Sequence, residues 1–133
     1  MALVFIDYTP LYYTAVAGTP APPRVVGKFV QIRNEETEYL VFAPKEFMKY
    51  HAGIVERFCL DKGVEGSYDS DKKYEIFDRS WIVAGGGKFD LDRDRMTLRL
   101  FDDSMAYGKF DRTGLAEKLL AFPEFTGLTV LID

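Results

Sequence analysis

The stretch VVGKFVQIRNEETEYLVFA, residues 25–43, carries the strongest architectural signal in this sequence. Its first part, residues 25–33, alternates in the manner of a β-strand with two different faces. One face carries Val26, Lys28, Val30 and Ile32, and the other carries Gly27, Phe29, Gln31 and Arg33. Residues 36–43 read as the next strand, and the polar turn RNEE between the two predicts a hairpin.

The segment after this hairpin predicts an amphipathic helix. Pro44 suits the first turn of a helix, and Gly63 suits its end. Between them, apolar positions recur at helical spacing, at 47, 51, 54, 55 and 58. His51, the only histidine in the chain, therefore lies on the apolar stripe of this helix. The polar residues 63–73 that follow are rich in turn formers and predict a loop.

The remaining segments predict further strands and one more helix. Residues 2–17 read as two short strands or one bent strand, and the proline-rich residues 18–24 read as a connector. Strand pieces are expected at 74–77, 80–84, 88–91, 95–101 and 127–132, and a second helix from about Asp111 or Thr113 to Phe122. This order predicts an α/β fold, with residues 1–133 forming a single domain in which a mixed β-sheet packs with two α-helices.

Composition narrows the classes of function. The net charge of -4 disfavours general binding to nucleic acid, which normally needs a basic surface. A single cysteine, Cys59, cannot form an internal disulfide and suits a reducing compartment. The first residues lack a basic leader region, and no apolar run reaches the ~20 residues of a membrane span. We expect a cytoplasmic monomer that binds neither nucleic acid nor membranes.

Several familiar sites are excluded by their spacing. Gly87-Lys88 lacks the other residues of a P-loop, and the glycines at 85–87 do not fit GxGxxG. Asp90, Asp92 and Asp94 copy the start of a calcium loop, but position 95 is arginine and position 101 is phenylalanine, so a hairpin turn is the better interpretation. With one histidine and one cysteine, a zinc site is unsupported. The sequence predicts no metal and no cofactor.

Four features are unusual for a scaffold. His51 lies on an apolar helical stripe, and Lys28 shares a strand face with aliphatic residues. The glycines at 85–87, followed by Lys88, suit a backbone that closely approaches a ligand or another chain segment, and the small residues 104–108 can present N–H groups to an anion. Each has a structural alternative: a hydrogen-bonded core histidine, an edge lysine, a β-bulge and a plain connector. Together they supply cations, N–H donors and a base for phosphoryl chemistry.

These residues resemble those of the Janus/Ocnus family, which includes the small phosphohistidine phosphatases. The matching pieces are GKFVQIR (27–33), KYHAGIVERF (49–58), GGGKF (85–89) and DSMAYGKFD (103–111). The resemblance covers roughly residues 27–125 and implies a phosphatase that needs no metal. It implies that His51 is catalytic and that phosphate is bound by Lys28, Lys88, Ser104 and Ala106.

The sequence departs from the family pattern at three positions. Lys88 replaces the usual arginine, so the bidentate fork is lost. A further family arginine falls on Ala43, and a histidine sometimes found after SMAYG corresponds to Arg112. The resemblance implies hydrolysis of a phosphoramidate P–N bond on a phosphohistidine-bearing protein or peptide, with His51 as general base or nucleophile. The alternatives are a non-catalytic phosphate- or phosphopeptide-binding module and a purely structural or interaction protein.

Overall fold

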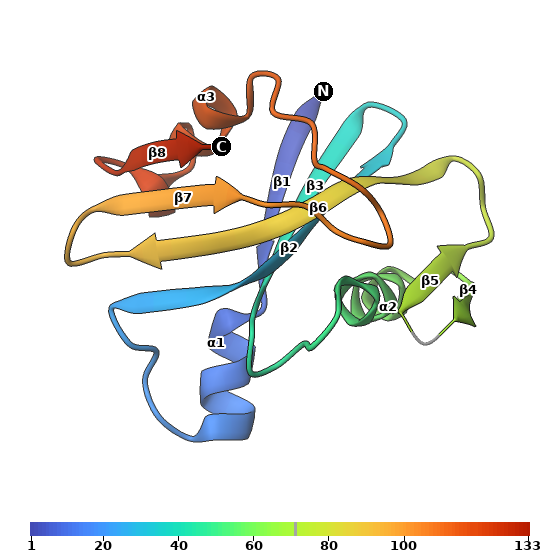
Figure 1. Ribbon diagram of the computed structural model, residues 1–133, viewed down its shortest axis with the longest axis horizontal. Helices are drawn as coiled ribbons and strands as arrows, with labels where there is room; N and C mark the ends of the chain where they lie inside the picture. Colours follow the sequence, from blue (N-terminus) through green and yellow to red (C-terminus); the bar gives the residue numbers. More distant parts are fainter. Residues whose placement is uncertain (71) are drawn as a thin grey trace.

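The computed structural model describes residues 1–70 and 72–133 and places them in one α/β domain with a mixed sheet, as predicted. The main sheet has six strands in the order β1-β3-β2-β6-β7-β8 (Figure 1). Their bounds are β1 Ala2–Asp7, β2 Arg24–Asn34, β3 Thr37–Pro44, β6 Trp81–Asp92, β7 Thr97–Phe101 and β8 Thr129–Ile132. β1 runs parallel to β3 and β7 parallel to β8, whereas the central pairs are antiparallel.

Short helices and a separate hairpin complete the fold. The hairpin consists of β4, Gly66–Ser70, and β5, Lys73–Ile76. The helical elements are α1 Thr9–Leu11, the π-helix Tyr12–Ala17, α2 His51–Lys62, α3 Leu115–Leu120 and the 3-10 turn Pro123–Phe125. In the part of the chain that the structure describes, none of these helices has both the length and the apolar character needed to cross a membrane.

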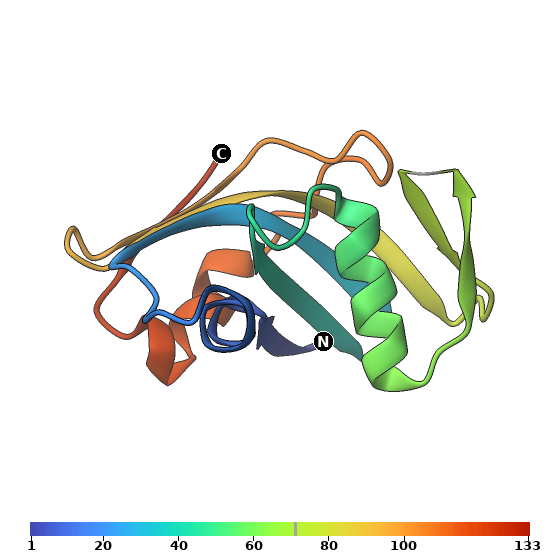
Figure 2. The same ribbon diagram turned by 90° about the horizontal axis from the view of Figure 1, so that it is seen from below.

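The curved sheet carries an apolar core on each face, as the alternation in β2 predicts. Phe29 packs in one core with residues of α3, including Leu115 and Leu119. Val30 and Ile32 pack in the other core, which is covered by the buried face of α2. Figure 2 shows α2 and the β4–β5 hairpin together at one end of the arched sheet. Lys28 therefore lies on the α2 side of the sheet.

The prediction for residues 2–17 was half wrong. Residues 2–7 form a strand, but the following segment is helical. The Thr9 N–H donates to the Asp7 carboxylate over 2.9 Å, which satisfies a donor that the start of a helix leaves open. Pro10 then lies in the first turn, where its missing N–H costs nothing. This third helical segment adds to the two predicted helices.

α2 begins later than predicted, and this changes the position of His51. Pro44 ends β3 instead of starting the helix, and residues 45–50 form the connection. His51 is consequently the first residue of α2, beside the positive end of the helix dipole. The predicted helix end holds, because Gly63 adopts the left-handed conformation at φ 68°.

The predicted loop 63–73 was also wrong in part. Residues 66–70 pair with residues 73–76 as the β4–β5 hairpin, and residue 71 lies outside the described residues. The side chains of β4 are mostly exposed, so the hairpin lacks the apolar alternation by which a half-buried strand is found in a sequence.

The glycine triplet lies inside a continuous strand. β6 runs unbroken through Gly85, Gly86 and Gly87, and its register against β2 shifts so that Gln31 pairs with Gly85 while Ile32 pairs with Val83. This irregularity is the β-bulge considered as one interpretation. The strand also approaches another chain segment closely, because a side chain on Gly85 would collide with the backbone of Lys109 and Phe110.

Close strand contact predicts that glycine is required at position 27. An added Cβ in Gly27→Ala would collide with the carbonyl oxygen of Ala43 on the neighbouring strand, so we expect the free energy of unfolding to fall by about 1–3 kcal/mol. Gly53→Ala is the matched control, because helical Gly53 is neighboured only by the flexible end of Met48. The control should be neutral or up to ~1 kcal/mol more stable. Urea unfolding measures both, and equal stability of the two variants would contradict the expectation.

Candidate active site

The predicted site residues line one cavity of about 360 Å³. The cavity lies where the start of α2, the β2–β6 pair and the loop after β7 meet. Its lining residues are Lys28, Tyr50, His51, Lys72, Lys88, Asp102, Asp103, Ser104, Met105 and Ala106. The structure therefore brings together all five residues that the sequence singled out, although they are scattered over residues 28–106.

Lys28 and Lys88 are direct partners in the antiparallel pairing of β2 with β6. Directly opposed residues point to the same face, so their ammonium groups share one side of the sheet. Like charges opposite each other destabilise a sheet. Lys28 is half-buried and forms no ion pair with any described residue. The pair therefore concentrates positive charge at the cavity.

A hydrogen bond to a ring nitrogen holds the His51 side chain, which is largely but not completely buried. The side chain is 8% exposed, and Nε2 lies 2.9 Å from the carbonyl oxygen of Gly87. A carbonyl only accepts, so Nε2 must carry the proton and donate it, which leaves the lone pair of a neutral ring on Nδ1. Nδ1 has no hydrogen-bond partner among the described residues. Every buried side-chain nitrogen of those residues does have a partner, so Nδ1 is not a buried atom. Nδ1 is therefore accessible from the cavity.

Glycine is needed beneath this ring. A Cβ on Gly86 would lie 2.8 Å from His51 Cδ2 and 2.8 Å from the carbonyl oxygen of Phe29. The glycines of β6 thus let the edge of the imidazole approach the strand closely, while the Gly87 carbonyl orients the ring. Gly86 permits the close approach and Gly87 accepts the hydrogen bond, so neighbouring residues of β6 supply both roles.

The environment of His51 favours its neutral form. Burial is the main cause that lowers its pKa from the ordinary value of 6.5, and the positive charges of Lys28 and Lys88 lower the pKa further. The hydrogen bond to Gly87 and the charge of Asp102 act in the opposite direction without reversing the shift. An unprotonated imidazole is available at neutral pH, as a base or nucleophile requires.

The loop 104–108 forms the opposite wall. Ser104 is buried, and its backbone pairs with Gly108, whose N–H donates to the Ser104 carbonyl over 2.7 Å. The Ser104 hydroxyl oxygen accepts from the Tyr107 N–H at 3.2 Å, which leaves its own proton to donate. Within the described chain, the N–H groups of Met105 and Ala106 have no hydrogen-bond partner. The loop therefore presents N–H and O–H donors at the cavity.

Contacts from three directions hold this loop in place. The Gly86 N–H donates to the Gly108 carbonyl at 3.0 Å, which attaches the loop to β6. The buried Gln31 side chain accepts from the Asp111 N–H at 2.7 Å and donates to the Asp111 carbonyl at 3.1 Å. The Tyr107 hydroxyl bonds to the backbone of Tyr74 in β5. The donors are thus fixed before any ligand binds.

Sequence reasoning missed several lining residues. The Lys88 ammonium pairs with Asp102 at 3.0 Å, and this bond is the first cause that lowers the pKa of the Asp102 carboxyl. Lys72 reaches the cavity from the β4–β5 hairpin, with its ammonium 5.4 Å from the centre of the Tyr50 ring. Asp102 follows β7 directly and precedes SMAYG, which was the only signal for it; Lys72 had none.

Two of the departures from the family pattern, Ala43 and Arg112, bring no charge to the cavity. Ala43 is fully buried and pairs with Lys28, so no charge reaches the cavity from that position. Arg112 is exposed and does not line the cavity, whereas Lys72 does.

The acidic residues at 90–94 lie at the predicted hairpin turn between β6 and β7. The Asp92 carboxylate accepts hydrogen bonds from the N–H groups of Asp94 and Arg95.

The lowered pKa of His51 can be measured directly, because the chain has one histidine. We expect the NMR titration of its ring protons to have a midpoint below pH 6.5 in the folded protein. Lys28→Ala removes a charge that disfavours imidazolium, so the midpoint should rise, whereas Lys62→Ala at the far end of α2 should leave it unchanged. A midpoint at or above 6.5, or no response to Lys28→Ala, would contradict this electrostatic description.

Comparisons with known proteins do not assign a family. No protein-family model matches the sequence, and no curated protein matches it. The resemblance to the Janus/Ocnus family stays a prediction from short motifs.

Proposed function

We propose that the chain is a metal-independent phosphatase that hydrolyses the P–N bond of phosphohistidine on a protein or peptide. The observation that carries the proposal is that a histidine with a lowered pKa and a directly opposed lysine pair line the same cavity. A neutral base beside an unbalanced positive charge suits an anionic electrophile. The fixed donors of the 104–108 loop suit the remaining oxygens of a tetrahedral phosphoryl group.

In this proposal each residue has a separate task. Lys28 and Lys88 neutralise the charge of the phosphoryl oxygens, and Lys88 exchanges its bond to Asp102 for one to the substrate. The Ser104 hydroxyl and the Ala106 N–H donate to oxygens on which negative charge accumulates in the transition state. His51 keeps its proton on Nε2 throughout, because Gly87 accepts there.

The chemical step uses the lone pair of Nδ1. As a base, Nδ1 takes a proton from water while the water oxygen bonds to phosphorus; as a nucleophile, Nδ1 itself bonds to phosphorus, and water later releases the phosphate. In both routes the P–N bond breaks and its electron pair goes to the leaving nitrogen. That nitrogen takes its proton from the Nδ1 imidazolium in the base route and from water in the nucleophilic route, where the remaining hydroxide later releases the phosphate. Protonated nitrogen is a good leaving group, so stabilisation by lysines and N–H groups suffices in this proposal.

A second function is favoured by one contact. The Lys88–Asp102 ion pair occupies a phosphate-binding cation in the free protein, and lysine there forms a point contact where a fork would orient the phosphoryl group. A site of this kind can bind a phosphorylated segment without aligning it for attack. The same chain would then act as a phosphate- or phosphopeptide-binding module.

Turnover of phosphoramidate separates these functions. Wild-type protein should release phosphate in the presence of a chelator, and His51→Ala should reduce kcat at least a hundredfold, since it removes the base or nucleophile. Cys59→Ala is a matched control, because Cys59 is also buried on α2 but faces the core. Circular dichroism checks that both variants fold.

Retention of full activity by folded His51→Ala would refute the catalytic role. Saturable phosphate binding by the wild type without turnover of phosphoramidate or of a phosphohistidine peptide would select the binding module. Activity that disappears with the chelator and returns with a divalent cation would contradict a metal-independent mechanism.

A further inference from the structure

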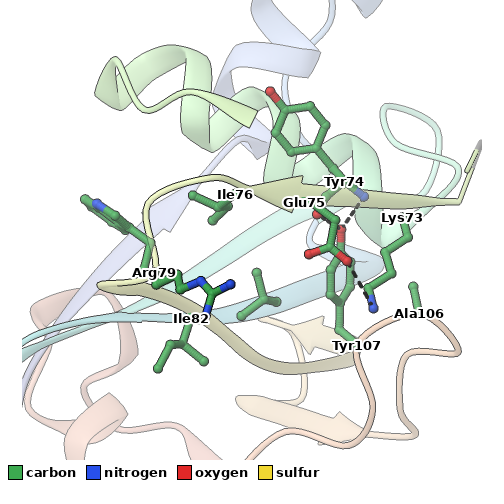
Figure 3. A pocket seen from close by; sticks show the side chains of 10 residues that line it. Lys73, Tyr74, Glu75, Ile76, Arg79, Ile82, Ala106 and Tyr107 are labelled. Carbon is green, nitrogen blue, oxygen red and sulfur yellow. Dashed lines mark hydrogen bonds and ion pairs between the residues drawn. The ribbon is translucent and has the colours of Figure 1, made fainter. Parts of the chain in front are cut away.

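A second cavity of about 360 Å³ adjoins the candidate active site. It lies between β5 and the start of β6, and we name it the β5–β6 groove (Figure 3). Its lining residues are Lys73, Tyr74, Glu75, Ile76, Arg79, Trp81, Ile82, Val83, Ala106 and Tyr107. Ala106 lines both cavities, so the groove and the candidate active site meet at the 104–108 loop.

The β5 side of the groove is the edge of that strand that faces away from β4. The Tyr107 hydroxyl donates to the Tyr74 carbonyl and accepts from the Tyr74 N–H, each at 2.8 Å, so these backbone groups face the groove (Figure 3). Backbone groups alternate between the two edges of a strand, and the Phe77 N–H accordingly donates to Glu65 on the opposite edge. Ile76 therefore presents its N–H and carbonyl to the groove, where the described residues supply no partner.

The β6 side of the groove is also incompletely paired. β2 covers one edge of β6 along its whole length, whereas β7 covers the other edge only over residues 88–92. The segment 108–110 covers this edge at Gly85 and Gly86, but residues 82–84 have no strand beside it in the described chain. Open edges on two facing strands favour an extended polypeptide, which hydrogen-bonds to such edges through its backbone.

The side chains of the groove indicate what that polypeptide carries. Trp81 and Val83 lie on the same face of β6 and give an apolar wall, whereas Ile82, which is 58% exposed, points to the other face. Lys73 is neutralised by Glu75 at 3.3 Å, whereas the exposed Arg79 has no ion pair or hydrogen bond to any residue that the structure describes. The unbalanced charge is positive, so an acidic side chain complements it.

We propose that the β5–β6 groove binds an extended, acidic segment of the substrate protein that flanks the phosphohistidine. This inference rests on the proposed function and names its substrate: a protein segment with apolar residues near the phosphohistidine and carboxylates farther along the chain. The backbone of the segment pairs with Ile76, its carboxylate pairs with Arg79, and its phosphohistidine enters the neighbouring cavity past Ala106.

Two synthetic nonapeptides test the groove. Both carry phosphohistidine at the centre with flanking valines, and their outer residues are either glutamates or lysines. Wild-type protein should have a KM about fivefold lower for the glutamate peptide, the size expected for an exposed ion pair. Arg79→Glu should reverse this preference, whereas Arg95→Glu, an equal charge change on the β6–β7 turn, should keep it. Hydrolysis of phosphoramidate should be the same in all three proteins.

The outcomes separate the groove from the catalytic proposal. Equal KM values for the two peptides, or equal effects of Arg79→Glu and Arg95→Glu, would overturn the proposal that the groove binds an acidic segment, even if phosphoramidate is hydrolysed. If the wild type hydrolyses neither phosphoramidate nor the peptides, the catalytic proposal fails. Binding in the groove is then tested by titrating the protein with the unphosphorylated glutamate peptide and following the protein amides by NMR. Shifts of the Ile76 and Ile82 amides that disappear in Arg79→Glu would support it, and unmoved amides would overturn it.

Discussion

The antiparallel pairing of β2 with β6 is the constraint on which the candidate site depends. Its register places Lys28 opposite Lys88 and brings the glycines of β6 beneath His51. Two ammonium groups on one face repel each other, and among the described residues only Lys88 has a compensating partner, Asp102. A bound dianion would relieve this repulsion more completely than one carboxylate does. In the proposed function, the repulsion lowers the stability of the free protein and raises its affinity for phosphate.

The same pairing sets the protonation state of the histidine. The glycines of β6 let the ring approach the strand closely, so Nε2 donates to the Gly87 carbonyl and Nδ1 keeps its lone pair toward the cavity. Burial and the lysines then disfavour a second proton. Binding of an anion acts in the opposite direction, because it cancels the lysine charges. Phosphate binding and proton uptake by His51 are therefore expected to be coupled, as a base that must accept a proton during the reaction requires.

Local patterns in the sequence predicted most of this site, and long-range contacts account for what they missed. The alternation of β2 gave the face of Lys28, and the glycine run indicated close approach, because both are properties of a single strand. The helix at residues 9–17 and the later start of α2 depend on Asp7 and on where β3 ends, neither of which a periodicity reveals. Lys72 reaches the cavity only through the β4–β5 hairpin, whose exposed strand lacks an apolar pattern.

The central claim is that the Lys28–Lys88 pair and the 104–108 loop bind phosphate beside His51. Titration of the protein with inorganic phosphate, followed by amide NMR, tests this claim most directly. We expect saturable shifts of the Met105 and Ala106 amides, together with a rise in the pKa of His51 as the anion offsets the lysine charges. Lys28→Gln should weaken both effects. Unmoved amides at residues 105 and 106, or binding of equal strength in Lys28→Gln, would contradict it.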